Sequence, residues 1–156
     1  MPIQTSDKIC ELSEAIQRRG EWKLQSEQVV FTNGCFDILH LGHVDYLEKA
    51  RLTGTKMIVA VNSDASVRTL KGPERPVNNE YARARIIASL QFVDLVIVFN
   101  EETPLELITQ LMPDILVKGD DYSIATIVGS KEVIAAGGQV KTIPLVPSYS
   151  TTGIIQ

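Results

Sequence analysis

Five short apolar runs recur along the chain, and longer segments with apolar residues at helical spacing separate them. The runs lie at 28–32, 56–61, 95–99, 115–118 and 140–143. Apolar runs of this length are typical of strands that are buried on both faces of a parallel sheet. The pattern therefore predicts a sheet built from these five segments.

The intervening segments predict helices at 6–19, 41–52, 64–70, 80–90, 104–111 and 131–136. Gly20 is expected to end the first helix, and Ser150 is expected to cap a further helix at the end of the chain. Strands that alternate with helices indicate an α/β fold with a doubly wound parallel sheet. We expect a single domain at 28–156, preceded by a helical extension at 1–27.

Composition narrows the class of protein. The chain of 156 residues is 44% hydrophobic and 22% charged, which is ordinary for a folded domain. Its apolar runs are too short to cross a bilayer, and its beginning lacks the apolar stretch of a signal peptide. The two cysteines, Cys10 and Cys35, are too few for a disulfide framework. We therefore expect reduced thiols, a cytoplasmic location and no membrane partner.

The charge distribution points to small anions as ligands. The net charge of −4 argues against nucleic acid as the partner. Between Arg68 and Arg85, however, five basic residues accompany only two acidic ones. Within this segment Lys71, Arg75 and Arg83 are candidates for clamping phosphate groups, because they lie in or near a loop rich in glycine and proline. A solvated basic face is the alternative interpretation, and we expect Arg68 and Arg85 to be structural or to face the solvent.

Polar clusters follow three of the predicted strands. They lie at 33–43 after the first strand, at 62–64 after the second and at 118–122 after the fourth. In doubly wound sheets, ligands bind beyond the carboxyl ends of the strands, at the point where the strand order reverses. The sequence therefore predicts a binding cleft formed by these three clusters.

The two histidines of the chain, His40 and His43, both fall at the predicted start of a helix. Residues three apart share one face of a helix, and a helix start offers free N–H groups to an anion. Gly42 allows a phosphate to approach the backbone closely. This arrangement predicts an anion cradle, and a pair of surface or metal-binding histidines is the alternative.

The segment 31–43, FTNGCFDILHLGH, resembles the opening motif of the cytidylyltransferase-like nucleotidyltransferase superfamily. More narrowly, it resembles the bacterial D-glycero-β-D-manno-heptose 1-phosphate adenylyltransferases. The likeness continues through 61–64, 70–72, 75–78, 93–94, 102–104, 113–119 and 150–152. It therefore covers nearly the whole chain, from about 29 to 155, and implies a Rossmann-like fold.

The resemblance implies a reaction in which a sugar phosphate oxygen attacks the α-phosphate of ATP in line and pyrophosphate leaves with Mg²⁺. The products would be ADP-heptose, a precursor of the lipopolysaccharide core, and pyrophosphate. His40, His43 and Lys71 would be catalytic, and Lys71 and Arg75 would bind the sugar phosphate. A phosphate nucleophile is already ionised near neutral pH, so the reaction needs no strong general base. A homodimer is expected by analogy with the family.

The resemblance also implies a set of nucleotide-binding residues. They are Asn33, Gly34, Cys35, Phe36, Asp37, Gly42, Asn62, Asp64, Arg83, Lys118, Gly119, Asp121, Tyr122, Ser150, Thr151 and Thr152. Asp37 is expected to orient the histidines or to help hold the metal, and a local cap is its alternative role. The ligands of the metal are not assigned by any motif.

Asp120 departs from the pattern of the heptose enzymes, which have a glycine at this position. Related glycerol-phosphate cytidylyltransferases often carry two acids here, as Asp120 and Asp121 do in this chain. A CTP-dependent cytidylyltransferase for glycerol 3-phosphate or a phospho-alcohol is therefore the second hypothesis. A module that binds nucleotide without turnover is the third.

Overall fold

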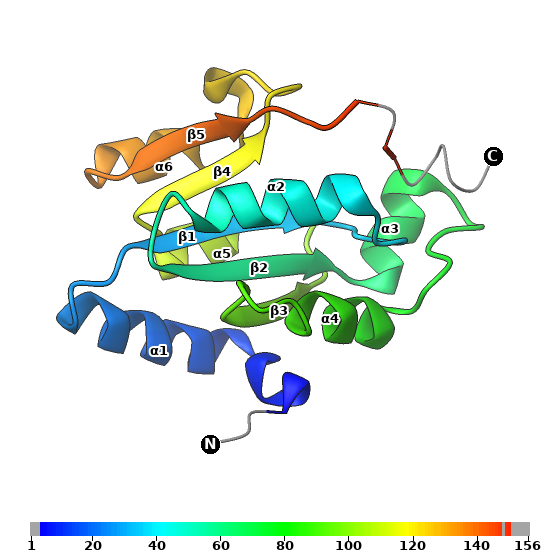
Figure 1. The fold of residues 1–156 in the computed structure, drawn as a ribbon, viewed down its shortest axis with the longest axis horizontal. Coiled ribbons are helices and arrows are strands. Elements are labelled where there is room, and N and C mark those ends of the chain that lie inside the picture. The colour runs from blue at the N-terminus through cyan, green and yellow to red at the C-terminus, as the bar shows by residue number, and fades with distance from the viewer. Residues whose placement is uncertain (1–3, 148, 151–156) are drawn as a thin grey trace.

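The computed structural model of the chain describes residues 4–147 and 149–150. Its centre is a parallel sheet of five strands in the order β3-β2-β1-β4-β5 (Figure 1). The strands are β1 (Val29–Gly34), β2 (Lys56–Asn62), β3 (Leu95–Phe99), β4 (Ile115–Gly119) and β5 (Gln139–Ile143). Each begins and ends within two residues of the bounds that the apolar runs predict, so the predicted sheet is confirmed.

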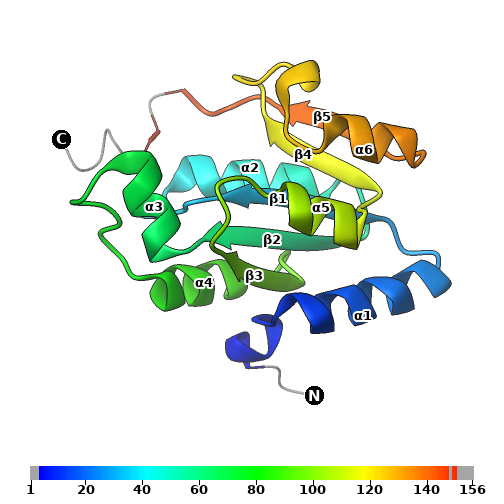
Figure 2. The ribbon, with the colours of Figure 1, turned by 180° about the vertical axis from the view of Figure 1, so that it is seen from behind.

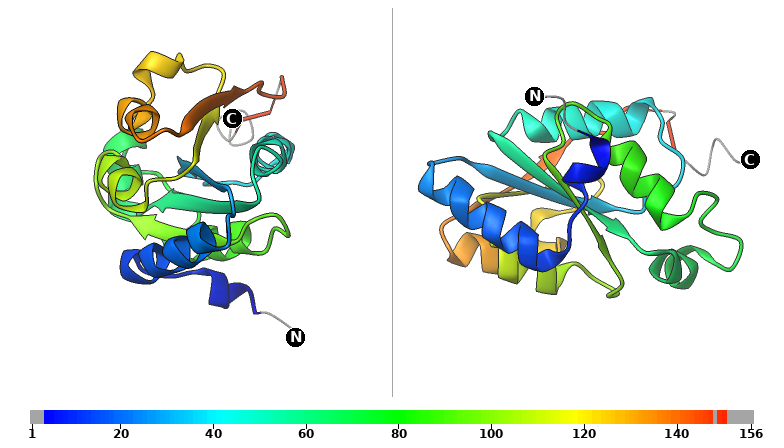
Figure 3. Two further views of the ribbon diagram at one scale, coloured as in Figure 1. Left: turned by 90° about the vertical axis from the view of Figure 1, so that its left-hand side faces the viewer. Right: turned by 90° about the horizontal axis from the view of Figure 1, so that it is seen from below.

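Helices cover both faces of the sheet, as predicted for a doubly wound fold (Figures 1, 2 and 3). One face carries α2 (Leu41–Arg51) and α4 (Glu80–Ala88), and the other carries α1 (Leu12–Leu24), α5 (Leu105–Leu111) and α6 (Ser130–Ala135). A further helix, α3 (Asp64–Lys71), follows β2 directly. No helix among the described residues is long and apolar enough to span a membrane. The predicted closing helix after Ser150 lies outside the described residues.

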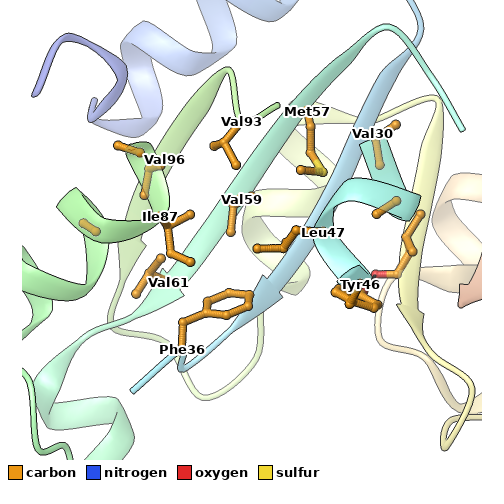
Figure 4. Close-up of a cluster of buried hydrophobic side chains, with 14 of the residues drawn as sticks. Val30, Phe36, Tyr46, Leu47, Met57, Val59, Val61, Ile87, Val93 and Val96 are labelled. Atoms are coloured by element: carbon orange, nitrogen blue, oxygen red, sulfur yellow. Dashed lines mark hydrogen bonds between the residues drawn. The ribbon is translucent and has the colours of Figure 1, made fainter. Parts of the chain in front are cut away.

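The strand β2 shows why the apolar runs have no polar alternation. Met57, Val59 and Val61 pack on the side of α2 and α4, in the cluster drawn in Figure 4. Ile58 and Ala60 pack on the opposite side, against α1, α5 and α6. All five side chains are fully buried. A strand with a helical layer on each face has no position at which a polar side chain can reach water.

The N-terminal helix differs from the prediction at both ends. A single 3₁₀ turn, Thr5–Lys8, comes first, and then Ile9 pairs with Val96 at the edge of the sheet. This pairing keeps the segment out of the helix, so α1 begins only at Leu12.

The helix α1 also continues through Gly20, which was expected to end it. A glycine inside a helix costs about 1 kcal/mol relative to alanine. Tertiary contacts offset this cost, because Arg19 and Trp22 on either side of Gly20 are both buried. Arg19 donates hydrogen bonds to the carbonyl oxygens of Leu111 and Met112 at the end of α5.

The strand order reverses between β1 and β4. From β1 the chain proceeds through β2 to β3 on one side, and β4 and β5 lie on the other side. The pairing of β1 with β4 is short and joins Val30 to Ile115 and Phe31 to Leu116. By contrast, β1 pairs with β2 over its full length, up to Gly34. The carboxyl ends of β1 and β4 therefore separate and leave room for a ligand at the position where doubly wound folds bind one.

Candidate nucleotide-binding site

A cavity of about 710 Å³ lies at the carboxyl ends of the strands. Most of the residues predicted to bind substrates line it: Asn33, Gly34, Cys35, Phe36, Asp37, His40, Gly42, His43, Asn62, Lys71, Arg75, Lys118, Gly119, Asp121, Tyr122 and Ser150. Thr151 and Thr152 lie outside the described residues. The three polar clusters that follow the predicted strands thus meet at one place, which is the location that the sequence predicts.

Two side chains bridge the gap between β1 and β4. The hydroxyl of Tyr46, on α2, lies 2.7 Å from Oγ1 of Thr32 in β1 and donates to the carbonyl oxygen of Val117 in β4 at 3.0 Å. The Nζ of Lys118 donates to the carbonyl oxygen of Asn33 at 3.2 Å. These bonds replace the ladder bonds that the separated strands cannot make, so they set the width of the cleft at its floor.

The rings of His40 and His43 stack at the entrance of α2, with their centroids 3.8 Å apart. The backbone N–H of His40 donates to Nδ1 of His43 at 3.3 Å. An Nδ1 that accepts a hydrogen bond carries no proton, so neutral His43 has its proton on Nε2. His43 is thereby set up as a hydrogen-bond donor through Nε2.

Burial and the neighbouring His40 lower the pKa of His43 to about 4. Burial also lowers the pKa of His40, whose Nδ1 is buried without a hydrogen-bond partner among the described residues. Both rings are therefore neutral at pH 7. Two neutral imidazoles can stack closely, whereas two imidazolium ions would repel each other.

Two glycines make room for aromatic rings beside the histidines. A Cβ at Gly42 would lie 2.9 Å from Cε1 of His40 and 3.1 Å from Cβ of Tyr149. A Cβ at Gly34 would lie 3.0 Å from the ring of Phe36, whose edge meets His43 at a centroid distance of 5.3 Å. Gly42 thus leaves room for the His40 ring to lie over the backbone, a role that was not predicted from the sequence.

Three cationic side chains line the cleft at two places. Lys71 ends α3, and Arg75 follows in the next loop. On the opposite side Lys118 lies one residue before the end of β4, and its Nζ lies 5.1 Å from the centroid of the Tyr122 ring. Burial lowers the pKa of Lys118, although Asp121 opposes this effect. The site thus presents positive charge from both sides of the cleft, which suits anionic ligands such as phosphate groups.

Asp37 organises the loop after α3. Its carboxylate accepts hydrogen bonds from Nε of Arg75 at 2.8 Å and from the backbone N–H groups of Val77 and Asn78. Burial raises the pKa of Asp37, but the hydrogen bonds from Asn78, Val77 and Arg75 outweigh burial and hold the pKa below its usual value. Among the described residues Asp37 has no recorded bond to either histidine. These bonds join Asp37 to a loop that lies about 40 residues further along the chain, so they are not those of the local cap that was the alternative prediction.

Arg83 and Asp64 lie outside the cleft, which corrects their prediction as nucleotide ligands. Arg83 is fully buried. Its nitrogens donate to the carbonyl oxygens of Cys35, Asn62 and Asn78. Its remaining nitrogen, Nη2, forms an ion pair with Asp64 at 2.9 Å. The guanidinium is thus occupied by the loops that surround the cleft, and a buried and fully bonded group cannot also clamp a phosphate.

The loop after β4 separates the two neighbouring acids. Asp121 and Tyr122 line the cleft. Asp120 does not line it, and its backbone N–H donates to the carbonyl oxygen of Ile143 in the adjacent strand β5. The pair of acids that suggested a cytidylyltransferase therefore contributes only Asp121 to the cleft.

The described part of the cleft offers no preformed metal centre. No group of three histidine, cysteine, aspartate or glutamate side chains among the described residues could hold a metal ion. Mg²⁺ prefers oxygen ligands, and the carboxylate of Asp37 is already engaged by Arg75 and two amides. The donor set therefore does not fit a magnesium ion held by the protein alone.

Several residues that line the cleft were not predicted from the sequence. They include Tyr46, Glu102, Thr103, Leu145, Val146 and Tyr149. Tyr46 could have been found, because it lies three residues after His43 on the same face of a helix. Glu102 and Thr103 lie in the segment 102–104, which is part of the family resemblance but to which no role was assigned. Leu145 and Val146 lie beyond the last strand, where no periodic pattern predicts a position in space.

Comparison with known proteins agrees with this geometry. A family model described as cytidylyltransferase-like matches residues 31–156. The chain is 54% identical over 153 residues to the bifunctional protein HldE of Magnetococcus marinus and 50% identical over 151 residues to that of Methylobacillus flagellatus. These matches cover 98% and 97% of this chain, respectively. The chain spans only 31% of the length of each relative.

Among solved structures, a lipopolysaccharide core biosynthesis protein from Thermoplasma volcanium matches with a TM-score of 0.64 and 28% identity. The match covers 80% of this chain and 99% of that one. A pantoate-β-alanine ligase from Francisella tularensis matches with a TM-score of 0.62 over 94% of this chain and 75% of that one. Its identity of 15% shows a shared fold alone.

Proposed function

We propose a reaction for this chain from the premise that it belongs to the cytidylyltransferase-like family, and is therefore a nucleotidyltransferase. In this proposal the chain transfers AMP from ATP to D-glycero-β-D-manno-heptose 1-phosphate and forms ADP-heptose and pyrophosphate. Support for the heptose substrate comes from relatives named HldE that are about half identical over nearly all of this chain.

The observation that carries the proposal is the stacked pair of neutral histidines in a cleft that is lined by cations on two sides. An acid–base mechanism would call for a group near its pKa at neutral pH, whereas His43 has a pKa of about 4. The attacking phosphate oxygen is already ionised and needs no base. The site is therefore suited to aligning two anions and to stabilising the charge that develops during phosphoryl transfer.

We assign a role to each residue in this proposal, and its position in the cleft supports that role. Neutral His43 donates through Nε2 to an oxygen of the triphosphate, and His40 stacks beside it. Lys118 approaches the nucleotide from the β4 side, while Lys71 and Arg75 bind the phosphate of the sugar on the α3 side. Held between these groups, an oxygen of the sugar phosphate attacks the α-phosphorus of ATP in line. The bond between the α-phosphorus and the departing pyrophosphate breaks as the new bond forms. No covalent enzyme intermediate is required.

We expect Mg²⁺ to enter as a complex with ATP, since the described residues of the cleft do not form a metal centre of their own. When bound, the ion neutralises charge on the triphosphate oxygens. We also propose that the protein is cytoplasmic, forms a homodimer, and has ATP and the sugar 1-phosphate as its partners rather than nucleic acid or a membrane.

The proposal is tested by measuring pyrophosphate release with ATP or CTP in combination with several sugar phosphates and with glycerol 3-phosphate. Turnover should be fastest with ATP and heptose 1-phosphate. Preference for CTP with glycerol 3-phosphate would favour the cytidylyltransferase hypothesis, although Asp120 lies outside the cleft. Tight binding of ATP without turnover on any acceptor would favour a non-catalytic module. The variant His43→Ala serves as the control for background hydrolysis.

A further inference from the structure

The cleft has two halves that differ in chemistry. The half beside β4 and β5 contains Tyr122, Leu145 and Val146, whose aromatic and apolar surfaces suit a nucleotide base. The half beside β2 and β3 contains Lys71 and Arg75, which suit the phosphate of the acceptor. The separated ends of β1 and β4 lie between the two halves.

A carboxylate also lines the β2/β3 half. Glu102 belongs to the loop between β3 and α5, which runs at the end of the sheet that faces α3 (Figure 2). Its position is unexpected for a site that receives two phosphorylated substrates, because a carboxylate repels phosphate. The carboxylate of Asp37 avoids this conflict through its bonds to Arg75 and two amides. Glu102, by contrast, is exposed and forms no ion pair or hydrogen bond within the described part of the chain.

We propose that Glu102 is a specificity-determining residue that accepts hydrogen bonds from hydroxyl groups of the acceptor sugar. The proposal rests on the proposed function and specifies its substrate class as polyhydroxylated sugar phosphates. An ionised carboxylate is purely an acceptor and can receive two neighbouring hydroxyl donors at once. Hydrogen bonds to a charged acceptor are roughly twice as strong as those between neutral groups. Thr103, which follows Glu102 and also lines the cleft, adds a hydroxyl to the same surface.

This role explains how the site tolerates the negative charge. The phosphate of the acceptor is held by Lys71 and Arg75, and the sugar ring extends from it towards the β3–α5 loop. A simple phosphate without hydroxyls gains nothing from Glu102 and is repelled by it. A site that hydrogen-bonds a substrate hydroxyl therefore discriminates strongly against analogues that lack it.

The test compares Glu102→Gln and Glu102→Ala with Glu101→Gln, a control in which the neighbouring exposed carboxylate does not line the cleft. Calorimetry in the presence of a non-hydrolysable ATP analogue measures the dissociation constant of heptose 1-phosphate and of deoxy-sugar 1-phosphates. A separate titration measures the dissociation constant of ATP. We expect both Glu102 variants to weaken sugar phosphate binding at least tenfold, with ATP binding and the Glu101→Gln variant unchanged.

The deoxy analogues provide a second measurement. Removing a sugar hydroxyl that donates to Glu102 should weaken binding of the sugar phosphate to the wild-type protein. The same removal should have little further effect on binding to Glu102→Ala. Equal or tighter binding of sugar phosphates by the Glu102 variants would overturn the inference while leaving the proposed function intact. If the wild-type protein binds ATP but none of the sugar phosphates, the proposed function fails and the inference fails with it.

Discussion

The substitution Tyr46→Phe tests whether one hydroxyl holds the separated ends of β1 and β4 together. The Tyr46 side chain is buried, and its hydroxyl contacts Oγ1 of Thr32 and the carbonyl oxygen of Val117 at 2.7 and 3.0 Å. Phenylalanine preserves the ring but leaves Oγ1 of Thr32 and the carbonyl oxygen of Val117 without this bond, and both of these residues are fully buried. A buried polar group without a partner costs about 1 to 3 kcal/mol, so we expect the free energy of unfolding to fall by about 2 kcal/mol.

Urea denaturation at pH 7 measures this change as a shift of the midpoint with an unaltered slope. Tyr81→Phe is the matched control, because the Tyr81 hydroxyl accepts a hydrogen bond from Arg85 on the exposed surface. Its loss should change stability by no more than about 0.5 kcal/mol. ATP should also bind more weakly to Tyr46→Phe, since the bridged strands form the floor of the cleft.

A double-mutant cycle with Thr32→Val separates the contributions of the two bonds. Removing both hydroxyls should cost less than the sum of the two single substitutions, because each variant alone leaves the partner unsatisfied. The reasoning is refuted if Tyr46→Phe costs no more than Tyr81→Phe. It is also refuted if the effects of Tyr46→Phe and Thr32→Val are strictly additive.

Three further predictions concern residues around the cleft. In NMR titrations of the free protein, His43 should change protonation near pH 4. The pKa of His43 is lower in the folded protein than in the unfolded chain. Its contribution to stability should therefore be lost as the pH falls from about 6.5 towards 4. Arg83→Met should lower the free energy of unfolding, measured by chemical denaturation, by about 3 to 5 kcal/mol, because it leaves Asp64 and three carbonyl groups without their partner. A loss below about 1 kcal/mol would contradict this role. Tyr149→Ala should shift the ring resonances of His40, which it faces at a centroid distance of 6.4 Å, more than those of His43, and equal shifts would contradict direct contact.

Periodicity predicted the fold well where one strong physical effect decides the structure. The run 56–61 is apolar throughout because both faces of β2 are covered, and the resulting strand is Lys56–Asn62. At Gly20, local propensity and tertiary packing disagree. The contacts of Arg19 with the end of α5 join residues more than 90 positions apart, and no local pattern in the sequence encodes such a contact.

The candidate site was predictable to the extent that strand ends meet at one edge of a parallel sheet. His40, His43 and Lys118 reach the cleft for this reason. Arg83 was misassigned because its charge is visible in the sequence but its burial is not. A basic residue on a helix after a loop rich in glycine and proline can face the ligand or support the loops around it. Only the position of its guanidinium decides between the two.

Two side chains that bind the surrounding loops, Arg83 and Asp37, explain why the residues that line the cleft are already in place. Arg83 joins the ends of β1 and β2 to the loop that carries Asn78, while Asp37 joins the same loop to the histidine motif. Such a buried network is stable only when every member is bonded, so the loops cannot shift independently. The stacked histidines therefore point into the cleft before any nucleotide arrives. Preorganised donors need no rearrangement during the reaction, so in the proposed reaction binding energy from ATP remains available to align the sugar phosphate for attack.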